Sequence, residues 1–176
     1  MEFFSGLLFS VCYYSFGFSY EMLIGLGIIT MLMIIVVSDL TYLIIPDEVL
    51  IFFSIYFIII EFLKSGLKGA ITHIGTGLLL FAIMYSVMLI GNKVLKKESL
   101  GGGDIKMMFL FGLVLDPLLG TLTIFLGSLF ALPMSLYLMK KNNEKVIPFG
   151  PFLLLAFAFI YFTKLTTPTI MSWLGF

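Results

Sequence analysis

Long, continuous runs of apolar residues alternate along the chain with short polar or glycine-containing stretches. Within each run the apolar residues are contiguous and do not alternate with polar ones, a pattern that favours helices over strands. Seven apolar segments can be delimited, at residues 3–18, 22–40, 46–63, 73–94 (entered from about residue 68), 104–115, 117–139 and 148–162. The tail that follows, residues 163–176, is predicted to lie at an interface.

The breaks between segments have local causes. Lysine, serine and glycine at 64–69 are expected to end the third segment before the fourth begins. Asp116 and Pro117 predict a tight corner, because proline suits the first turn of a helix and aspartate can cap it. Segment 104–115 is too short to cross a bilayer alone, since a straight crossing needs ~20 residues.

Composition identifies the surroundings of these helices. Hydrophobic residues make up 61% of the chain and charged residues 11%, and the mean hydropathy is +1.17. A water-soluble fold of this size cannot bury so much apolar surface, and lipid admits only helices or closed barrels. We therefore expect an all-α, polytopic integral membrane bundle with about six to seven transmembrane helices, as one domain over residues 1–176.

Charge and cysteine content exclude several classes. The net charge is zero and all basic residues are lysines, which does not suggest nucleic-acid binding. Cys12 is the only cysteine, so neither an intrachain disulfide nor a cysteine-clustered zinc site can form.

The lysines also predict an orientation. Counting the segments as successive crossings places Asp39 and the connections at 93–106 and 140–147 on one face of the membrane. That face has seven lysines: Lys93, Lys96, Lys97, Lys106, Lys140, Lys141 and Lys145. The other face has three: Lys64, Lys68 and Lys164. The positive-inside bias makes the seven-lysine face cytoplasmic.

Two acids are the main candidates for chemistry. Asp39 closes a long apolar run, and Asp104 follows three glycines at the start of another. An acid within a membrane protein's apolar region is a functional candidate, and two at matching depth suggest one site. Paired carboxylates can share a proton, so that one activates water and the other acts as the acid, with no need for a metal. The alternatives are a polar helix end for Asp39 and an N-cap for Asp104.

The residues beside Asp104 extend this candidate site. Gly101, Gly102 and Gly103 allow close backbone approach of a substrate just before a helix start. Lys106 could pair with one of the two acids or with lipid phosphate, or could extend to the interface. We take these four residues as candidate substrate contacts.

Other polar and small residues have more ordinary interpretations. Asp47 follows Pro46 at a predicted helix start and is expected to be structural. Glu61 and His73 are expected near the far interface, unrelated to the two acids. Gly75 and Gly77 offer a small face on which another helix can pack closely.

Three stretches resemble the motifs of a known family. Residues 38–47 contain Asp39 followed seven positions later by Pro46-Asp47, residues 101–106 contain the glycines and Asp104, and residues 148–151 read Pro-Phe-Gly-Pro. In this order and spacing they resemble the type IV prepilin peptidases, membrane aspartyl proteases of the Gly-x-Gly-Asp class. The resemblance covers essentially the whole chain.

The resemblance implies catalytic roles for Asp39 and Asp104. It implies as substrate the precursor of a type IV pilin, pseudopilin or competence pilin, cut at the cytoplasmic edge of its apolar helix. The expected location is the bacterial inner (plasma) membrane, with several crossings and the active site near the cytoplasmic face. The expected partners are the precursor protein and the lipid bilayer, with no nucleic acid, while the sequence does not indicate an oligomeric state.

Many members of the family also methylate the new N-terminus with S-adenosylmethionine, using a segment with paired Cys-x-x-Cys motifs. Residues 2–9 resemble the join just downstream of that segment, and no such cysteine pairs are present. We expect no cofactor, and S-adenosylmethionine only if a methylation segment is supplied.

Two hypotheses from other functional classes are also compatible with the sequence. In a small transporter or proton channel, Asp39 and Asp104 would form a relay or ion site. Such proteins often show internal repeats, which this sequence lacks. The third reading is a structural membrane subunit that docks through Gly75 and Gly77.

Overall fold

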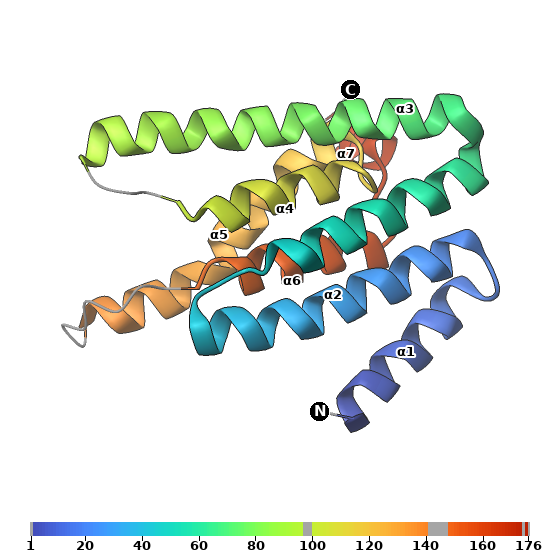
Figure 1. Ribbon diagram of the computed structural model, residues 1–176, viewed down its shortest axis with the longest axis horizontal. Helices are drawn as coiled ribbons and strands as arrows, with labels where there is room; N and C mark the ends of the chain where they lie inside the picture. The colour runs from blue at the N-terminus through green and yellow to red at the C-terminus, as the bar shows by residue number, and fades with distance from the viewer. Residues whose placement is uncertain (1, 97–99, 141–147, 174, 176) are drawn as a thin grey trace.

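The computed structural model describes residues 2–96, 100–140, 148–173 and 175, and its regular structure in these ranges is entirely helical (Figure 1). The helices in chain order are α1 (Glu2–Phe16), α2 (Tyr20–Tyr42), α3 (Asp47–Leu95), α4 (Gly102–Gly112), α5 (Pro117–Lys140), α6 (Gly150–Phe162) and α7 (Thr167–Trp173). Their positions follow the apolar segments, and α7 lies within the tail that was expected at an interface.

Three of these helices are long and apolar enough to cross a membrane: Tyr20–Tyr42, Asp47–Val94 and Pro117–Tyr137. Two shorter helices, at Ser5–Phe16 and Gly150–Phe162, are also apolar. The chain is thus an all-helical protein with three long candidate membrane spans, one of which, α3, contains two of the predicted segments.

The reversal inside α3 depends on a single residue. Gly66 has φ 70° and ψ −172°, and the helix continues on both sides of it. Residues with a Cβ atom rarely adopt this left-handed φ, whereas glycine does so at little cost. The chain therefore folds back at Gly66, and the two halves of α3 spread apart from this reversal (Figure 1). The predicted break over residues 64–69 is therefore confirmed, and it occurs at Gly66 alone.

The short helix α4 lies between the two halves of α3 (Figure 1) and packs most extensively against them. Two glycines permit the close approach. A Cβ atom placed on Gly112 would lie 2.5 Å from the Cα of Gly77, and one placed on Gly77 would lie 2.7 Å from the carbonyl oxygen of Phe109. The predicted small face is confirmed for Gly77 and is wrong for Gly75, where such an atom would meet nothing within 4 Å.

The interior of the bundle joins α4 to the remaining helices. Met107, Met108 and Phe111 of α4 are fully buried, and Phe111 stacks on Phe157 of α6 with ring centroids 4.3 Å apart. Aromatic pairs of this kind add stabilisation beyond the area that they bury. Buried contacts on both sides therefore fix α4, which is too short to cross the membrane by itself.

The helix ends gather at two sides of the bundle (Figure 1). The end of α2 and the beginnings of α3, α4 and α6 lie at one side, which we call the acid end because it contains Asp39 and Asp104. The loop between α1 and α2 and the reversal at Gly66 lie at the other side, which we call the opposite end.

Candidate active site

Asp39 lies in the last turn of α2, where a tight turn reverses the chain. The backbone N–H of Leu43, a residue with φ 55°, donates to the carbonyl of Asp39 at 3.0 Å. The Ser38 hydroxyl donates to the carbonyl of Ile44 at 2.8 Å and closes the turn. The chain after α2 therefore folds back, and Ile45 lies beside the first turns of α4 and α6.

Asp104 lies in the first turn of α4, behind the three glycines. Gly101 is the N-cap residue in an extended conformation, and its backbone N–H faces the Asp104 carboxyl group. Free N–H groups and the helix dipole favour negative charge at this place. The alternative role of Asp104, as an N-cap, is not found, because no side chain caps α4 and Asp104 lies inside the first turn.

The two acids come together although they are 65 positions apart in the sequence. Their carboxyl groups are close enough to interact electrostatically. Ile45 lies in the contact region, because its Cδ1 atom is 3.0 Å from the positions that Cβ atoms would take at both Gly103 and Gly150. The packing of Ile45 against two glycines thus brings the start of α4 and the start of α6 against the turn that follows α2.

Both acids are buried and incompletely paired. Asp39 is 6% exposed and Asp104 is 7% exposed. Oδ2 of Asp39 and Oδ1 of Asp104 are buried and have no hydrogen-bond partner among the described residues. Burying an ionised carboxylate without a partner is costly, and buried polar atoms without partners need an explanation. Two carboxyl groups at close range that share a proton can explain both atoms.

The sequence did not predict a role at the site for Gly150. Its backbone N–H, at the start of α6, faces the Asp39 carboxyl group, and a Cβ atom at this position would lie 2.9 Å from Asp39 Oδ2. The signal for this residue was the Pro-Phe-Gly-Pro motif, which supported the family resemblance but gave no location. Each acid is therefore faced by a backbone N–H from a helix start.

The three glycines before Asp104 differ in their surroundings. A Cβ atom on Gly103 would lie 2.8 Å from Ile45 Cβ, and one on Gly101 would lie 3.1 Å from Asp104 Oδ2. Gly102 has open space around it and is exposed. The proposed contact of these glycines with a substrate stays a prediction, since no substrate is present.

Lys106 pairs with Asp47 instead of Asp39 or Asp104. Its Nζ atom lies 2.7 Å from both carboxylate oxygens of Asp47, and the two side chains are 50% and 57% exposed. The pair joins the start of α3 to α4 beside the site. Of the alternatives for Lys106, pairing with one of the two buried acids is thus wrong, because its side chain points to the exposed side of α4.

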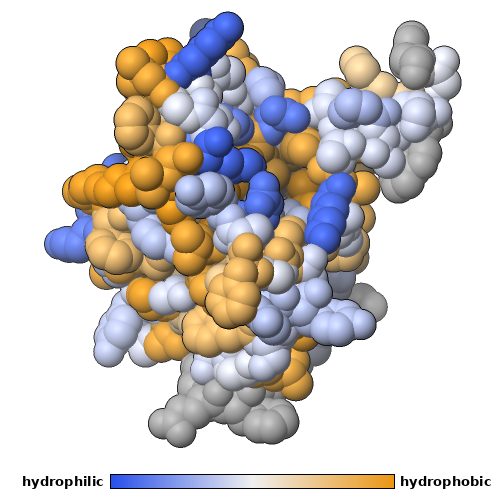
Figure 2. All heavy atoms as spheres, turned by 90° about the vertical axis from the view of Figure 1, so that its right-hand side faces the viewer, coloured by the Kyte–Doolittle hydropathy of each residue, from blue (hydrophilic) through white to orange (hydrophobic). Residues whose placement is uncertain are grey.

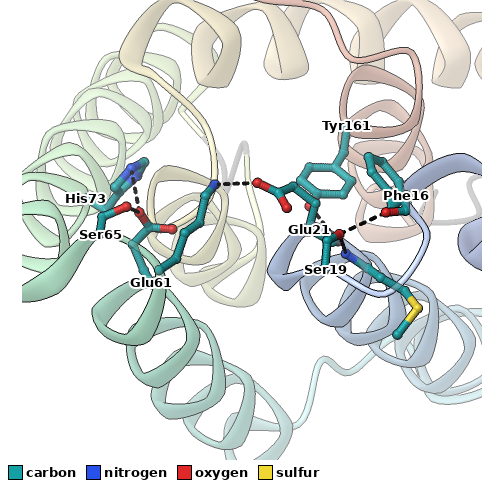
Figure 3. A network of polar contacts seen from close by, with 9 residues as sticks. Phe16, Ser19, Glu21, Glu61, Ser65, His73 and Tyr161 are labelled. Carbon is teal, nitrogen blue, oxygen red and sulfur yellow. Dashed lines mark hydrogen bonds and ion pairs between the residues drawn. The ribbon is translucent and has the colours of Figure 1, made fainter.

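Glu61 and His73 lie at the opposite end, as predicted (Figure 3). Glu61 is 4% exposed, accepts a hydrogen bond from the Ser65 hydroxyl at 2.6 Å, and lies 3.5 Å from Nε2 of His73. In the described part of the chain, no three histidine, cysteine, aspartate or glutamate residues gather as metal ligands.

Comparison with known proteins gives a family. The model of the type IV leader peptidase family matches residues 26–136, more than half of the chain, and includes both Asp39 and Asp104. No curated protein and no solved structure matches significantly. The chain therefore belongs to the type IV leader peptidase family, a membership that implies aspartic peptidase activity.

Proposed function

We propose that this protein is an intramembrane aspartyl endopeptidase that removes the leader peptide of type IV prepilins, pseudopilins or competence pilins. One observation carries the proposal: two buried carboxyl groups from different helices interact at one end of the bundle, and each is faced by a backbone N–H from a helix start. Two such groups are sufficient for amide hydrolysis without a metal.

The chemistry needs one proton shared between Asp39 and Asp104. The ionised carboxylate takes a proton from a water molecule, whose oxygen attacks the carbonyl carbon of the scissile peptide bond. The protonated carboxyl group gives its proton to the carbonyl oxygen. The C–N bond then breaks as the carboxyl group that took the proton from water gives it to the nitrogen. A hydroxyl of the tetrahedral intermediate gives its proton to the other carboxylate, so the pair is again singly protonated. The two residues form one titrating unit, because neither role belongs permanently to one of them.

The glycines give the substrate a place beside the acids. A scissile bond inside a helix has its backbone groups tied into hydrogen bonds, so that stretch must first be opened locally. Gly101 and Gly102 are exposed, and Gly102 has open space around it. Their backbone groups would pair with the opened stretch of the precursor, as an added strand pairs with a sheet edge.

An apolar groove next to the site would receive the apolar helix of the precursor. It is a hollow of about 360 Å³ between the two halves of α3 and α4, lined by apolar side chains that include Ile51, Phe81 and Phe109. Asp47 and Lys106 lie along the same groove, and Lys106 is two residues from Asp104. Neither Asp39 nor Asp104 lines this hollow, so it would hold part of the precursor's apolar helix beside the site.

The acid end would face the cytoplasm. The helices that flank the connections from α3 to α4 and from α5 to α6 finish and begin at this end (Figure 1). Residues 93–106 and 140–147, which contain these connections, carry seven of the ten lysines. Lys97, Lys141 and Lys145 lie outside the described residues. The positive-inside bias then places Asp39 and Asp104 near the cytoplasmic surface of a bacterial plasma membrane, where the basic leader of a precursor would lie.

The test is a cleavage assay with a purified prepilin in detergent or liposomes. Asp39→Asn and Asp104→Asn should each reduce the cleavage rate by at least about 10³-fold, because neither variant can share a proton in the same way. Asp116→Asn is the matched control, since Asp116 is exposed at the opposite end and should retain the wild-type rate. All three variants should insert into membranes at the wild-type level.

Normal cleavage by both site variants would overturn the assignment of Asp39 and Asp104. An intact precursor after incubation with wild-type protein, together with a proton flux that both variants abolish, would support the transporter reading.

A further inference from the structure

A second cavity lies at the opposite end of the bundle, away from the two acids. Its volume is about 480 Å³, within the range of small-ligand sites. The ends of α1 and α6, the starts of α2 and α5, the segment between α4 and α5, and the first half of α3 all contribute to its wall. Figure 2 views the molecule from this end and shows hydrophilic side chains gathered around the middle of the face.

Charges of both signs surround the cavity in equal number. Lys64 and Glu21 form an ion pair at 3.4 Å, with both side chains more than a third exposed. Lys164 donates to the carbonyl of Ser15 at 2.7 Å. Asp116 is the fourth charged residue that lines the cavity. Figure 3 shows Glu21 beside Ser19 and Tyr161 in this region. The wall has two cationic and two anionic groups, which suits a ligand that carries both signs.

Aromatic and apolar groups add to the cavity. The Nζ atom of Lys164 lies 4.8 Å from the centroid of the Phe16 ring, so this ring face already attracts a cation. Below the charged groups, the cavity is lined by the buried side chains of Ile24, Leu119 and Ile160. A ligand that fits must therefore combine a charged head with an apolar part.

The cavity lies at the level where the apolar spans end. The span of α2 begins at Tyr20, next to Glu21, and the span of α5 begins at Pro117, next to Asp116. Lys64 lies two residues before the reversal at Gly66. The charged groups of the wall are thus at the depth of lipid headgroups, where a phospholipid is the abundant amphipathic molecule with a charged head.

We propose that this cavity binds the head of a zwitterionic phospholipid. The phosphate lies between the ammonium groups of Lys64 and Lys164, the amine of the head lies against Glu21 and Asp116, and the glycerol region contacts the apolar wall. Charge-assisted hydrogen bonds of both signs hold the head. The balanced charge of the wall selects a zwitterionic head over an anionic one.

Native mass spectrometry of the delipidated protein in detergent tests this binding. Phosphatidylethanolamine is titrated against the wild type, the double variant Lys64→Gln/Lys164→Gln, and Lys68→Gln as the control at the same end outside the cavity. We expect the double variant to bind at least about tenfold more weakly than wild type, because it loses two charge-assisted contacts. Lys68→Gln should bind as the wild type does.

Phosphatidylglycerol, which has no amine, should bind the wild type more weakly than phosphatidylethanolamine. Equal binding of phosphatidylethanolamine by all three proteins, or tighter binding of phosphatidylglycerol by the wild type, would overturn the proposal. If the double variant is not folded, as judged by circular dichroism, the single variant Lys164→Gln takes its place, with an expected loss of at least about threefold. The readout does not involve cleavage, so its result is independent of the proposed peptidase activity.

Discussion

A close backbone contact between α3 and α4 predicts a sharp difference between Gly75 and Gly77 of α3. Gly77→Ala would place a Cβ atom 2.7 Å from the carbonyl oxygen of Phe109 and 2.9 Å from its Cδ2 atom. The oxygen belongs to the backbone of α4, so the contact can relax only if α4 moves away from α3. Gly75→Ala, two residues earlier, meets nothing within 4 Å and is the matched control.

The expected magnitudes follow from two opposing effects. Alanine is favoured over glycine inside a helix by roughly 1 kcal/mol, so Gly75→Ala should be neutral or slightly stabilising. Overpacking costs about 1–3 kcal/mol in Gly77→Ala and offsets that gain. The free energies of unfolding of the two variants should therefore differ by about 2 kcal/mol. A shift of α4 also moves Asp104, and a displacement near 1 Å can reduce a catalysed rate by about 10²-fold.

Two assays check this expectation. Unfolding in mixed micelles with increasing dodecyl sulfate gives the stabilities, and cleavage of a purified prepilin gives the rates. Equal stability of the Gly75→Ala and Gly77→Ala proteins would refute the packing argument. A destabilised Gly77→Ala protein with an unchanged cleavage rate would refute only the link between the position of α4 and the chemistry.

Three further substitutions have expected outcomes. Gly150→Ala places a Cβ atom 2.9 Å from Asp39 Oδ2 and should lower cleavage at least about tenfold while membrane insertion stays normal, as fractionation would show. Ser65→Ala leaves the buried carboxylate of Glu61 without its 2.6 Å hydrogen bond and should lower the unfolding free energy by about 1–3 kcal/mol in mixed micelles. Lys106→Gln removes an exposed ion pair and should change stability by less than about 1 kcal/mol, so a much larger loss in the same micelle titration would contradict the surface assignment.

The hydrophobic pattern predicted the helices well, because each apolar segment has the length and continuity of one helix. It also predicted the break in α3, over residues 64–69, but not which residue makes it. The structure reverses the chain at Gly66 alone, and the polar neighbours of Gly66 stay helical. The residue types at 64–69 indicate that a helix can be interrupted there. They do not indicate which of the two glycines, Gly66 or Gly69, adopts the positive φ that reverses the chain.

The site was predictable in part. The acids Asp39 and Asp104 were singled out because charge is rare in apolar segments, and the structure brings them together. The roles of Ile45 and Gly150 were not predictable, because they arise from contacts between segments that are distant in the sequence. The pairing of Lys106 with Asp47 was not predicted for the same reason, because the two residues are 59 positions apart. The place of Asp47 at a helix start had already explained its charge.

The burial of α4 has a consequence for how the protein is made. An eleven-residue helix that begins with glycines and an acid is a poor candidate for partition into lipid on its own. It gains favourable surroundings only after both halves of α3 have formed the hairpin that encloses it and α6 has supplied Phe157 on the other side. During biogenesis the long helices should therefore insert first, and α4 should pack between them late. A nascent chain would then bring Asp39 and Asp104 together only after α6 has left the ribosome.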